Sequence, residues 1–147
     1  MTTTQERWSA LLDAARQARD QAYAPYSRYR VGAALLDDQG RIHPGCNVEN
    51  AAYPEGVCAE AGAVSHMVLN GGRRIVAAVV VGEGAQAITP CGGCRQKLRE
   101  FGDDALVIRS ADAQGRWLGE HTLGQLLPSS FGPAHLAGKK EDADDEA

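Results

Sequence analysis

Residues 75–82 read Ile75-Val76-Ala77-Ala78-Val79-Val80-Val81-Gly82, a continuous and mostly β-branched run. Such a run is typical of a strand that is buried on both faces. Residues 58–69, which precede it, have helical spacing and stop at Asn70-Gly71-Gly72. Pro90 suits the start of a further helix, because its missing N–H costs nothing there, and this helix runs to Phe101. A buried strand between two helices predicts an α/β fold.

The N-terminal part predicts a helix followed by a hairpin. Thr3 and Glu6 match a capping box, apolar residues follow at helical spacing over 8–22, and Pro25 ends the helix. The remaining predicted elements are strands at 31–36 and 41–47 joined by a turn at 37–40, strands at 106–110 and 117–121, and a helical turn at 123–127. Together these elements predict an α/β sandwich built on a mixed sheet.

Length and charge limit the class of protein. The chain has 147 residues, of which 44% are apolar, which suits one domain with its own core. We expect a catalytic domain at 1–138 and an acidic, disordered tail at 139–147. The tail carries two positive and five negative charges, −3 of the net −4, so the rest of the chain is near −1. The chain therefore lacks the excess of positive charge that would attract a nucleic-acid backbone, and a small-molecule substrate is expected.

The sequence also indicates a compartment. Residues 1–7 contain no apolar signal run, and the longest apolar stretch, 75–81, is too short to span a bilayer. We therefore expect a soluble cytoplasmic protein without a membrane partner. Disulfides are rare in the cytoplasm, so the four cysteines indicate metal ligands or reactive thiols rather than disulfide bonds.

Four residues form a constellation that indicates a catalytic zinc site: Cys58 and Glu60 in Cys58-Ala59-Glu60, and Cys91 and Cys94 in Pro90-Cys91-Gly92-Gly93-Cys94. Three thiolates leave the fourth tetrahedral position open for water, whereas a structural zinc site closes all four. In zinc deaminases a glutamate that does not bind the metal carries protons. Both segments are expected at helix N-termini, where N–H groups and the helix dipole favour thiolates. The sequence thus predicts one Zn²⁺ per chain and Glu60 as the proton carrier.

Other interpretations of these residues stay open at this point. Cys91 and Cys94 alone suit a binding module with structural zinc or a thiol oxidoreductase, although the third thiol and the glutamate favour catalysis. Cys46 is a candidate fourth ligand that would close the site, but a buried free cysteine is common. His66 lies eight residues after Cys58, and we expect it to pack or to face solvent rather than to bind metal.

Several motifs occur together and in order along most of the chain: Ala24-Pro25-Tyr26-Ser27, Val31-Gly32-Ala33-Ala34, Gly45-Cys46-Asn47-Val48-Glu49-Asn50-Ala51-Ala52-Tyr53, Cys58-Ala59-Glu60, Pro90-Cys91-Gly92-Gly93-Cys94-Arg95-Gln96, Leu126-Leu127-Pro128 and Phe131. In this combination they resemble the small homotetrameric zinc-dependent cytidine deaminases, of the cytidine and deoxycytidylate deaminase family. The resemblance implies a three-layer α-β-α sandwich on a mixed five-stranded sheet. It also implies a homotetramer whose pockets are shared between subunits.

The resemblance further implies a role for each matching residue. It assigns metal binding to Cys58, Cys91 and Cys94, proton transfer to Glu60, and substrate binding to Asn47, Glu49, Ala59, Tyr29 and Phe131. In this assignment Asn47 and Glu49 bind the ribose, and Phe131 lines the pocket of a neighbouring subunit. The implied activity is hydrolytic deamination of cytidine and deoxycytidine with release of ammonia, in pyrimidine salvage.

Two positions depart from the family pattern. Many members carry an arginine after Cys-Ala-Glu that offsets the charge of a thiolate, whereas this chain has Ala61. Three thiolates on one dication leave a charge of −1, so backbone N–H groups at the helix starts or Arg95 are expected to compensate. Tyr29 stands where many members have phenylalanine. A non-arginine residue after Cys-Ala-Glu also resembles the blasticidin deaminases, so a modified cytosine nucleoside such as blasticidin S is the alternative substrate.

Overall fold

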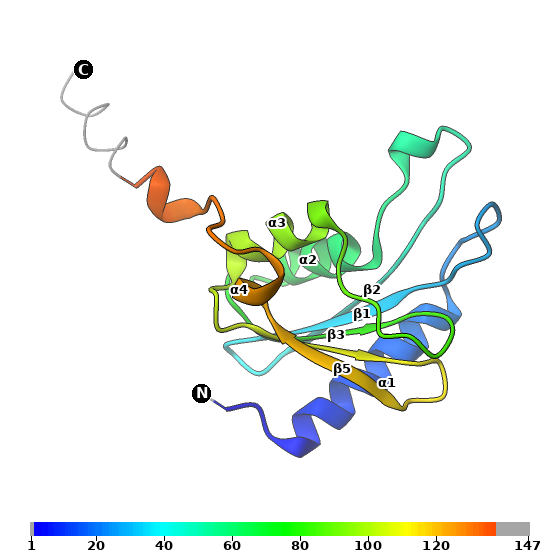
Figure 1. Cartoon of the computed structure of the whole chain (residues 1–147), viewed down its shortest axis with the longest axis horizontal. Coiled ribbons are helices and arrows are strands. Elements are labelled where there is room, and N and C mark those ends of the chain that lie inside the picture. The colour runs from blue at the N-terminus through cyan, green and yellow to red at the C-terminus, as the bar shows by residue number, and fades with distance from the viewer. Residues whose placement is uncertain (1, 138–147) are drawn as a thin grey trace.

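A five-stranded sheet forms the centre of the computed structural model, which describes residues 2–137 (Figure 1). The strands are β1 (Gly32–Asp37), β2 (Ile42–Cys46), β3 (Ile75–Val81), β4 (Val107–Ala111) and β5 (Trp117–Thr122). Their order across the sheet is β2-β1-β3-β4-β5. Strands β3 and β4 pair in parallel and the other neighbours pair antiparallel, so the sheet is mixed, as predicted.

Helices cover both faces of the sheet. Helix α1 (Gln5–Asp20) lies on one face, while α2 (Ala59–Leu69) and α3 (Gly92–Phe101) lie on the other (Figure 1). Shorter elements complete the described chain: η1 (Tyr53–Glu55), α4 (Leu123–Leu126) and η2 (Pro133–His135). This arrangement confirms the three-layer α-β-α sandwich. No helix in the described part of the chain is both long enough and apolar enough to cross a membrane.

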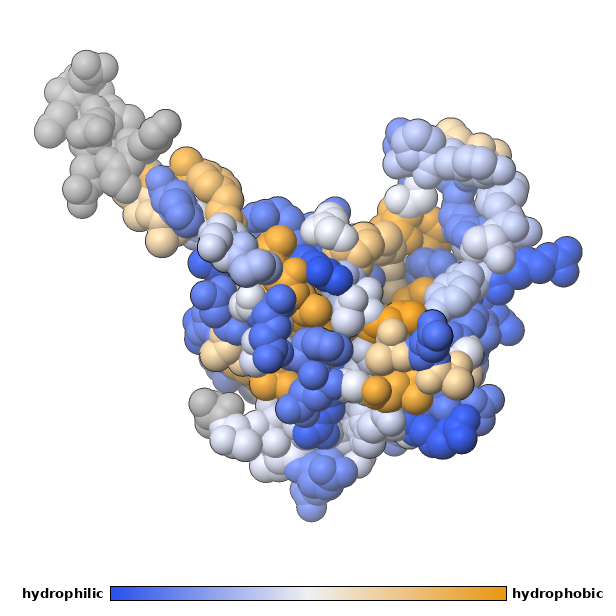
Figure 2. Space-filling view, viewed as in Figure 1, coloured by the Kyte–Doolittle hydropathy of each residue, from blue (hydrophilic) through white to orange (hydrophobic). Residues whose placement is uncertain are grey.

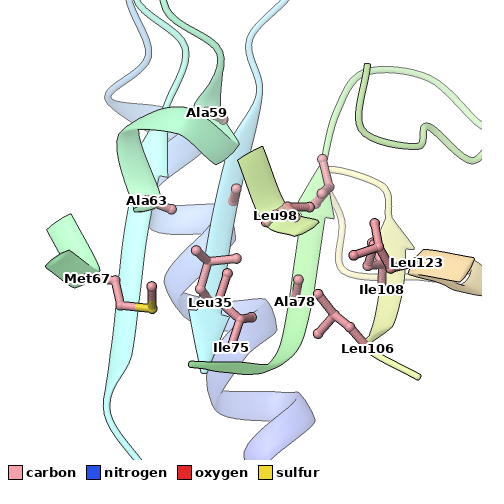
Figure 3. Packing of buried hydrophobic residues seen from close by; sticks show 12 residues of the cluster. Leu35, Ala59, Ala63, Met67, Ile75, Ala78, Leu98, Leu106, Ile108 and Leu123 are labelled. Atoms are coloured by element: carbon pink, nitrogen blue, oxygen red, sulfur yellow. The ribbon is translucent and has the colours of Figure 1, made fainter. Parts of the chain in front are cut away.

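Strand β3 joins the two halves of the core. Ala78 and Val80 belong to the cluster under α2 and α3, whereas Ala77, Val79 and Val81 belong to the cluster under α1. Successive strand residues point to opposite faces, so a strand covered on both sides must be apolar throughout. Figure 3 shows the first of these clusters, in which residues of α2 point at the sheet.

The close approach of β2 to α2 positions the chain segment that follows β2. A Cβ atom at Gly45 would lie 2.3 Å from the backbone nitrogen of Ala63 and 2.4 Å from the carbonyl oxygen of Ala59. Only glycine lets the strand come so near the helix. The segment that follows β2 is therefore held beside the N-terminal turn of α2.

The hairpin is confirmed, and its turn is stabilised by one buried carboxylate. Asp37 Oδ1 accepts hydrogen bonds from the backbone N–H groups of Gln39 and Arg41, at 2.9 Å each. Gly40 has a φ of +81°, a conformation that glycine adopts without strain. Strands β1 and β2 pair from Gly32 with Cys46 to Leu36 with Ile42.

Three predicted helix boundaries were wrong by a few residues. The N-cap of α1 is Thr4 rather than Thr3: its hydroxyl accepts from the N–H of Arg7 at 3.3 Å, so Glu6 takes no part in a capping box. The helix ends at Asp20, well before Pro25. Pro90 precedes α3 instead of opening it, because Cys91 is the N-cap. The predicted tail at 139–147 lies outside the described residues.

Candidate metal and substrate site

Two helix starts bring three cysteines together. Cys58 is the N-cap of α2 and Cys91 is the N-cap of α3, while Cys94 lies in the first turn of α3 and is buried. Their three Sγ atoms lie within 4.8 Å of one another, and the Cys58 and Cys91 Sγ atoms are 3.8 Å apart. The convergence that the sequence predicted is therefore confirmed. Cys46, at the end of β2, does not belong to this group of described residues.

The spacing and chemistry of the three thiols fit zinc. Tetrahedral zinc binds thiolate sulfur at about 2.3 Å, which places two sulfurs about 3.8 Å apart. The observed separation between Cys58 and Cys91 matches this value. Three protein ligands also leave one tetrahedral position for a reactant, which is the arrangement of catalytic rather than structural zinc sites.

The local environment shifts the pKa values of the three thiols in different directions. Burial, and then the nearby charge of Cys91, raise the pKa of the Cys58 thiol. Burial also raises the pKa of Cys94, with Glu60 adding to the effect. The backbone N–H of Cys94 lowers the pKa of Cys91, as expected for a thiol at the start of a helix. Three thiolates so close together repel one another, so a dication is needed to hold all of them ionised.

Glu60 lies in the first turn of α2 and is only 5% exposed. Burial raises the pKa of its carboxyl group. Its negative charge in turn raises the pKa of all three thiols, which places it beside them. It does not belong to the group of converging ligand atoms. The carboxyl group therefore sits next to the metal site without being needed to fill it.

Arg95 does not act on the thiols in the way that the sequence suggested. Its Nε donates to the carbonyl oxygen of Pro90 at 2.7 Å, its Nη1 to that of Leu126 at 2.7 Å, and its Nη2 to the hydroxyl of Thr89 at 2.9 Å. All these partners are neutral oxygens. The guanidinium fixes the segment that leads to Cys91. Of the two expected sources of charge compensation, this leaves the helix starts.

A cavity of about 540 Å³ adjoins the cysteine cluster. Its lining comes from the 26–27 turn and from both sides of an arm formed by residues 48–57, and it is made of Tyr26, Ser27, Asn47, Val48, Glu49, Asn50, Tyr53, Gly56, Val57 and Cys58. Figure 1 shows the arm rising from the body beside α2, and Figure 2 shows a hollow with apolar surface between the arm and the body. The cavity thus joins polar groups, aromatic rings and one thiol.

Asn47 and Glu49 both hold the loop that carries Tyr29. The Oδ1 atom of Asn47 accepts from the N–H of Val31 at 2.8 Å, and its Nδ2 donates to the carbonyl oxygen of Tyr29 at 2.9 Å. Oε1 of Glu49 accepts from the N–H groups of Tyr26 and Ser27 at 2.9 and 3.1 Å. Ser27, through its hydroxyl and its N–H, lowers the pKa of Glu49. Both residues line the cavity, and their hydrogen bonds to the loop fix the orientation of the carboxylate and of the amide.

The other predicted substrate residues lie in different settings. The hydroxyl of Tyr29 donates to the carbonyl oxygen of Glu83 at 3.2 Å. Ala59 is the first residue of α2 and is buried, at 1% exposed. Phe131 is 57% exposed and does not line this cavity; its carbonyl oxygen accepts from Gln96, and its ring stacks on His135. The chain alone does not bring Phe131 to the cysteines.

Sequence reasoning did not single out Tyr53 and Val57, which also line the cavity. Both are exposed, at 76% and 45%, and their side chains stand on the arm. Tyr53 packs edge to face against Tyr26 at 5.8 Å between ring centroids. Large apolar residues in an exposed turn were the available signal for both.

Comparison with known proteins gives a consistent picture. Residues 5–110 match the family model described as the zinc-binding region of cytidine and deoxycytidylate deaminases. A cytidine deaminase of Sporosarcina psychrophila is 39% identical over 86% of this chain and 93% of that protein. One from Mycobacterium tuberculosis is 43% identical over 85% and 90%. The crystal structure of a cytidine deaminase from Burkholderia pseudomallei superimposes with a TM-score of 0.78 at 42% identity, covering 88% of this chain and all of that one.

Proposed function

The chain belongs to the cytidine and deoxycytidylate deaminase family with its zinc-binding region, and we propose that it hydrolyses cytidine and deoxycytidine to uridine and deoxyuridine with release of ammonia. The observation that carries this function is the convergence of three cysteine thiols with a buried carboxyl group beside them. Relatives of 39–43% identity over most of the chain are cytidine deaminases, which favours this reaction over deamination of blasticidin S.

Cys58, Cys91 and Cys94 hold one zinc ion per chain in this proposal. When bound, zinc supplies a Lewis acid that makes water nucleophilic at neutral pH. Glu60 accepts a proton from the water that attacks C4 of the cytosine ring and delivers it to N3. It then takes the remaining proton of the new hydroxyl group on C4 and delivers it to the amino group, which leaves as ammonia. Its burial excludes competing water and keeps the carboxyl group able to hold a proton between these steps.

The nucleoside lies in the cavity beside Cys58. Asn47 and Glu49 meet the ribose hydroxyls, because their polar groups face the cavity and are already oriented by the 26–31 loop. Tyr29 and the backbone of Ala59 contact the base. The polar wall for the sugar and the thiol cluster for the base lie at the same cavity, which suits a nucleoside better than a free base.

Phe131 completes the pocket of a neighbouring subunit in a homotetramer. Its ring is exposed, and the C-terminal segment that carries it stands off the body of the chain (Figure 1). The cavity of one chain is open, so a residue supplied by a partner would close it. We place this catalytic domain, residues 1–138, in the cytoplasm in pyrimidine salvage, acting on small nucleosides and neither on nucleic acid nor at a membrane.

Ammonia release from four substrates tests the proposal. Cytidine and deoxycytidine should be deaminated, while cytosine and blasticidin S should be poor substrates. Metal analysis with X-ray absorption should find one zinc per chain with three sulfurs and one light atom. Active protein without metal, or a four-sulfur shell, would rule out the catalytic zinc site. Preferential turnover of blasticidin S would instead establish the alternative substrate.

A further inference from the structure

We propose that His43 and His66 form a second metal site, for a first-row transition-metal dication such as Ni²⁺ or Zn²⁺, separate from the cysteine cluster. His43 lies in β2 and His66 in the last turn of α2. Their Nδ1 atoms face each other at 3.1 Å. Two imidazole nitrogens bound to one such ion, at about 2.0–2.1 Å each, lie about 2.9–3.4 Å apart. The two ring nitrogens already have the spacing of ligands that share a metal.

The ring of His43 is oriented by a buried carboxylate. Its Nε2 lies 2.8 Å from Oδ2 of Asp37, and both side chains are almost completely buried. Asp37 also accepts from Nε of Arg41 at 2.8 Å. Its other oxygen accepts from the backbone N–H groups of Gln39 and Arg41, so several donors hold Asp37 as a carboxylate. A carboxylate behind a histidine is the usual outer partner of a metal-binding imidazole.

This partner determines which nitrogen of His43 is available. An ionised carboxylate only accepts, so Nε2 of His43 carries the proton and Nδ1 presents a lone pair toward His66. Without metal, Nδ1–H of His66 donates to that lone pair. A metal takes the place of this proton when His66 moves its proton from Nδ1 to Nε2. No net proton is lost in this change, since His66 only changes tautomer.

Access and ligand type also suit a transition metal. His66 is exposed, so an ion reaches the pair from the surface, whereas His43 is 2% exposed and held in place. Imidazole nitrogens favour nickel, copper and zinc over magnesium or calcium. Water molecules would fill the remaining coordination positions. The ion would tie β2 to α2.

Nickel uptake by the zinc-loaded protein tests the proposal. We expect saturable binding of one Ni²⁺ per chain in addition to the catalytic zinc, and a rise in the melting temperature that increases with nickel concentration. Absorption at the nickel edge should show nitrogen and oxygen neighbours without sulfur. His66→Gln should weaken nickel binding by at least about tenfold. Because His66 is exposed, this variant is expected to fold.

His135→Gln is the matched control, because it removes another exposed histidine. It should bind nickel as the unmodified protein does. The site is refuted if no nickel binds beyond the zinc, if His66→Gln binds it equally well, or if sulfur appears in the nickel shell. None of these readouts measures deamination, so they are independent of the proposed function.

Discussion

Arg95 donates from Nε to the carbonyl oxygen of Pro90 at 2.7 Å, and this bond holds the residue before the second cysteine of the cluster. The rest of its guanidinium is bound to Leu126 and Thr89. An arginine so engaged anchors the backbone and is not available to neutralise a thiolate. With alanine at position 61, we expect the compensation to come from N–H groups at the helix starts, and at Cys91 the backbone N–H of Cys94 already lowers the pKa of the thiol.

Ala61→Arg tests that charge balance. A guanidinium that contacts a thiolate would make the site less negative, so the water nucleophile would ionise more readily. We expect the acid limb of the pH profile of kcat/KM to move to lower pH, by up to about one unit. The measurement is the deamination rate of cytidine across the pH range.

Ala61→Met is the control, because it adds length without charge and should leave the acid limb in place. A crystal structure of Ala61→Arg establishes whether the new side chain reaches a sulfur. An unchanged profile in a variant with that contact would contradict the charge argument.

Glu60→Gln should keep the fold and the zinc but lose activity. The amide has nearly the same shape as the carboxyl group, yet it cannot accept and deliver protons. General acid–base groups contribute on the order of 10²–10⁴ in rate, and Glu60 serves several steps. Turnover of cytidine together with zinc content measures the effect, and Glu55→Gln on the nearby arm is the control. Near-normal turnover would remove Glu60 from the mechanism.

Tyr29→Phe should weaken nucleoside binding modestly. The tyrosine hydroxyl donates to the carbonyl oxygen of Glu83, which anchors the ring to the segment after β3. A hydrogen bond of this kind contributes about 0.5–1.5 kcal/mol, equivalent to roughly a 2- to 10-fold rise in KM with little change in kcat. Tyr23→Phe, which removes the hydroxyl of another exposed tyrosine, should leave KM unchanged. A large fall in kcat in Tyr29→Phe would show that the hydroxyl acts in the chemical step.

Asp37 should make the folded state sensitive to acid. Its pKa falls from 3.8 to about 2 on folding, so its stabilising contribution is complete above about pH 4 and is lost as the pH falls toward 2. The shift corresponds to a free energy of unfolding on the order of 2 kcal/mol. Urea unfolding at pH 7 and pH 3 should show that Asp37→Asn is less stable at pH 7 and loses less stability at pH 3.

Asp38→Asn, at the exposed neighbouring position, is the comparison for Asp37→Asn and should unfold like the unmodified protein at both pH values. If Asp37→Asn and the unmodified protein lost equal stability between pH 7 and pH 3, the ionisation of Asp37 would not be linked to folding.

Local sequence predicted the elements whose patterns are strongest. The run at 75–81 identified β3, since its alternate residues enter both halves of the core. The chemistry of thiols and zinc predicted that Cys58 and Cys91 meet, although 33 residues separate them. The predicted first residues of the helices were wrong by about one position, because the N-cap depends on the backbone angles of a single residue, such as Thr4.

Tertiary partners could not be predicted from the sequence. The bond from Arg95 to Leu126 depends on how α3 packs against α4. The pairing of His43 with His66 depends on the close approach of β2 to α2 at Gly45. No periodic pattern indicates either contact, since each joins residues that are far apart along the chain and have no special spacing.

Glu49→Ala should separate nucleoside from free-base chemistry. Both loop bonds of Glu49 end on Oε1, so Oε2 is the oxygen that the proposed contact with a sugar hydroxyl would use. A polar group left unsatisfied in the complex costs about 1–3 kcal/mol, so kcat/KM for cytidine should fall roughly 10- to 100-fold. The poor activity on cytosine should hardly change, and zinc should remain bound. Glu49→Gln keeps an oxygen for the loop. Its kcat/KM for cytidine should therefore lie between the values of the unmodified protein and of Glu49→Ala. Equal efficiency on cytosine and cytidine, or an unaffected Glu49→Ala variant, would show that this carboxylate does not recognise ribose.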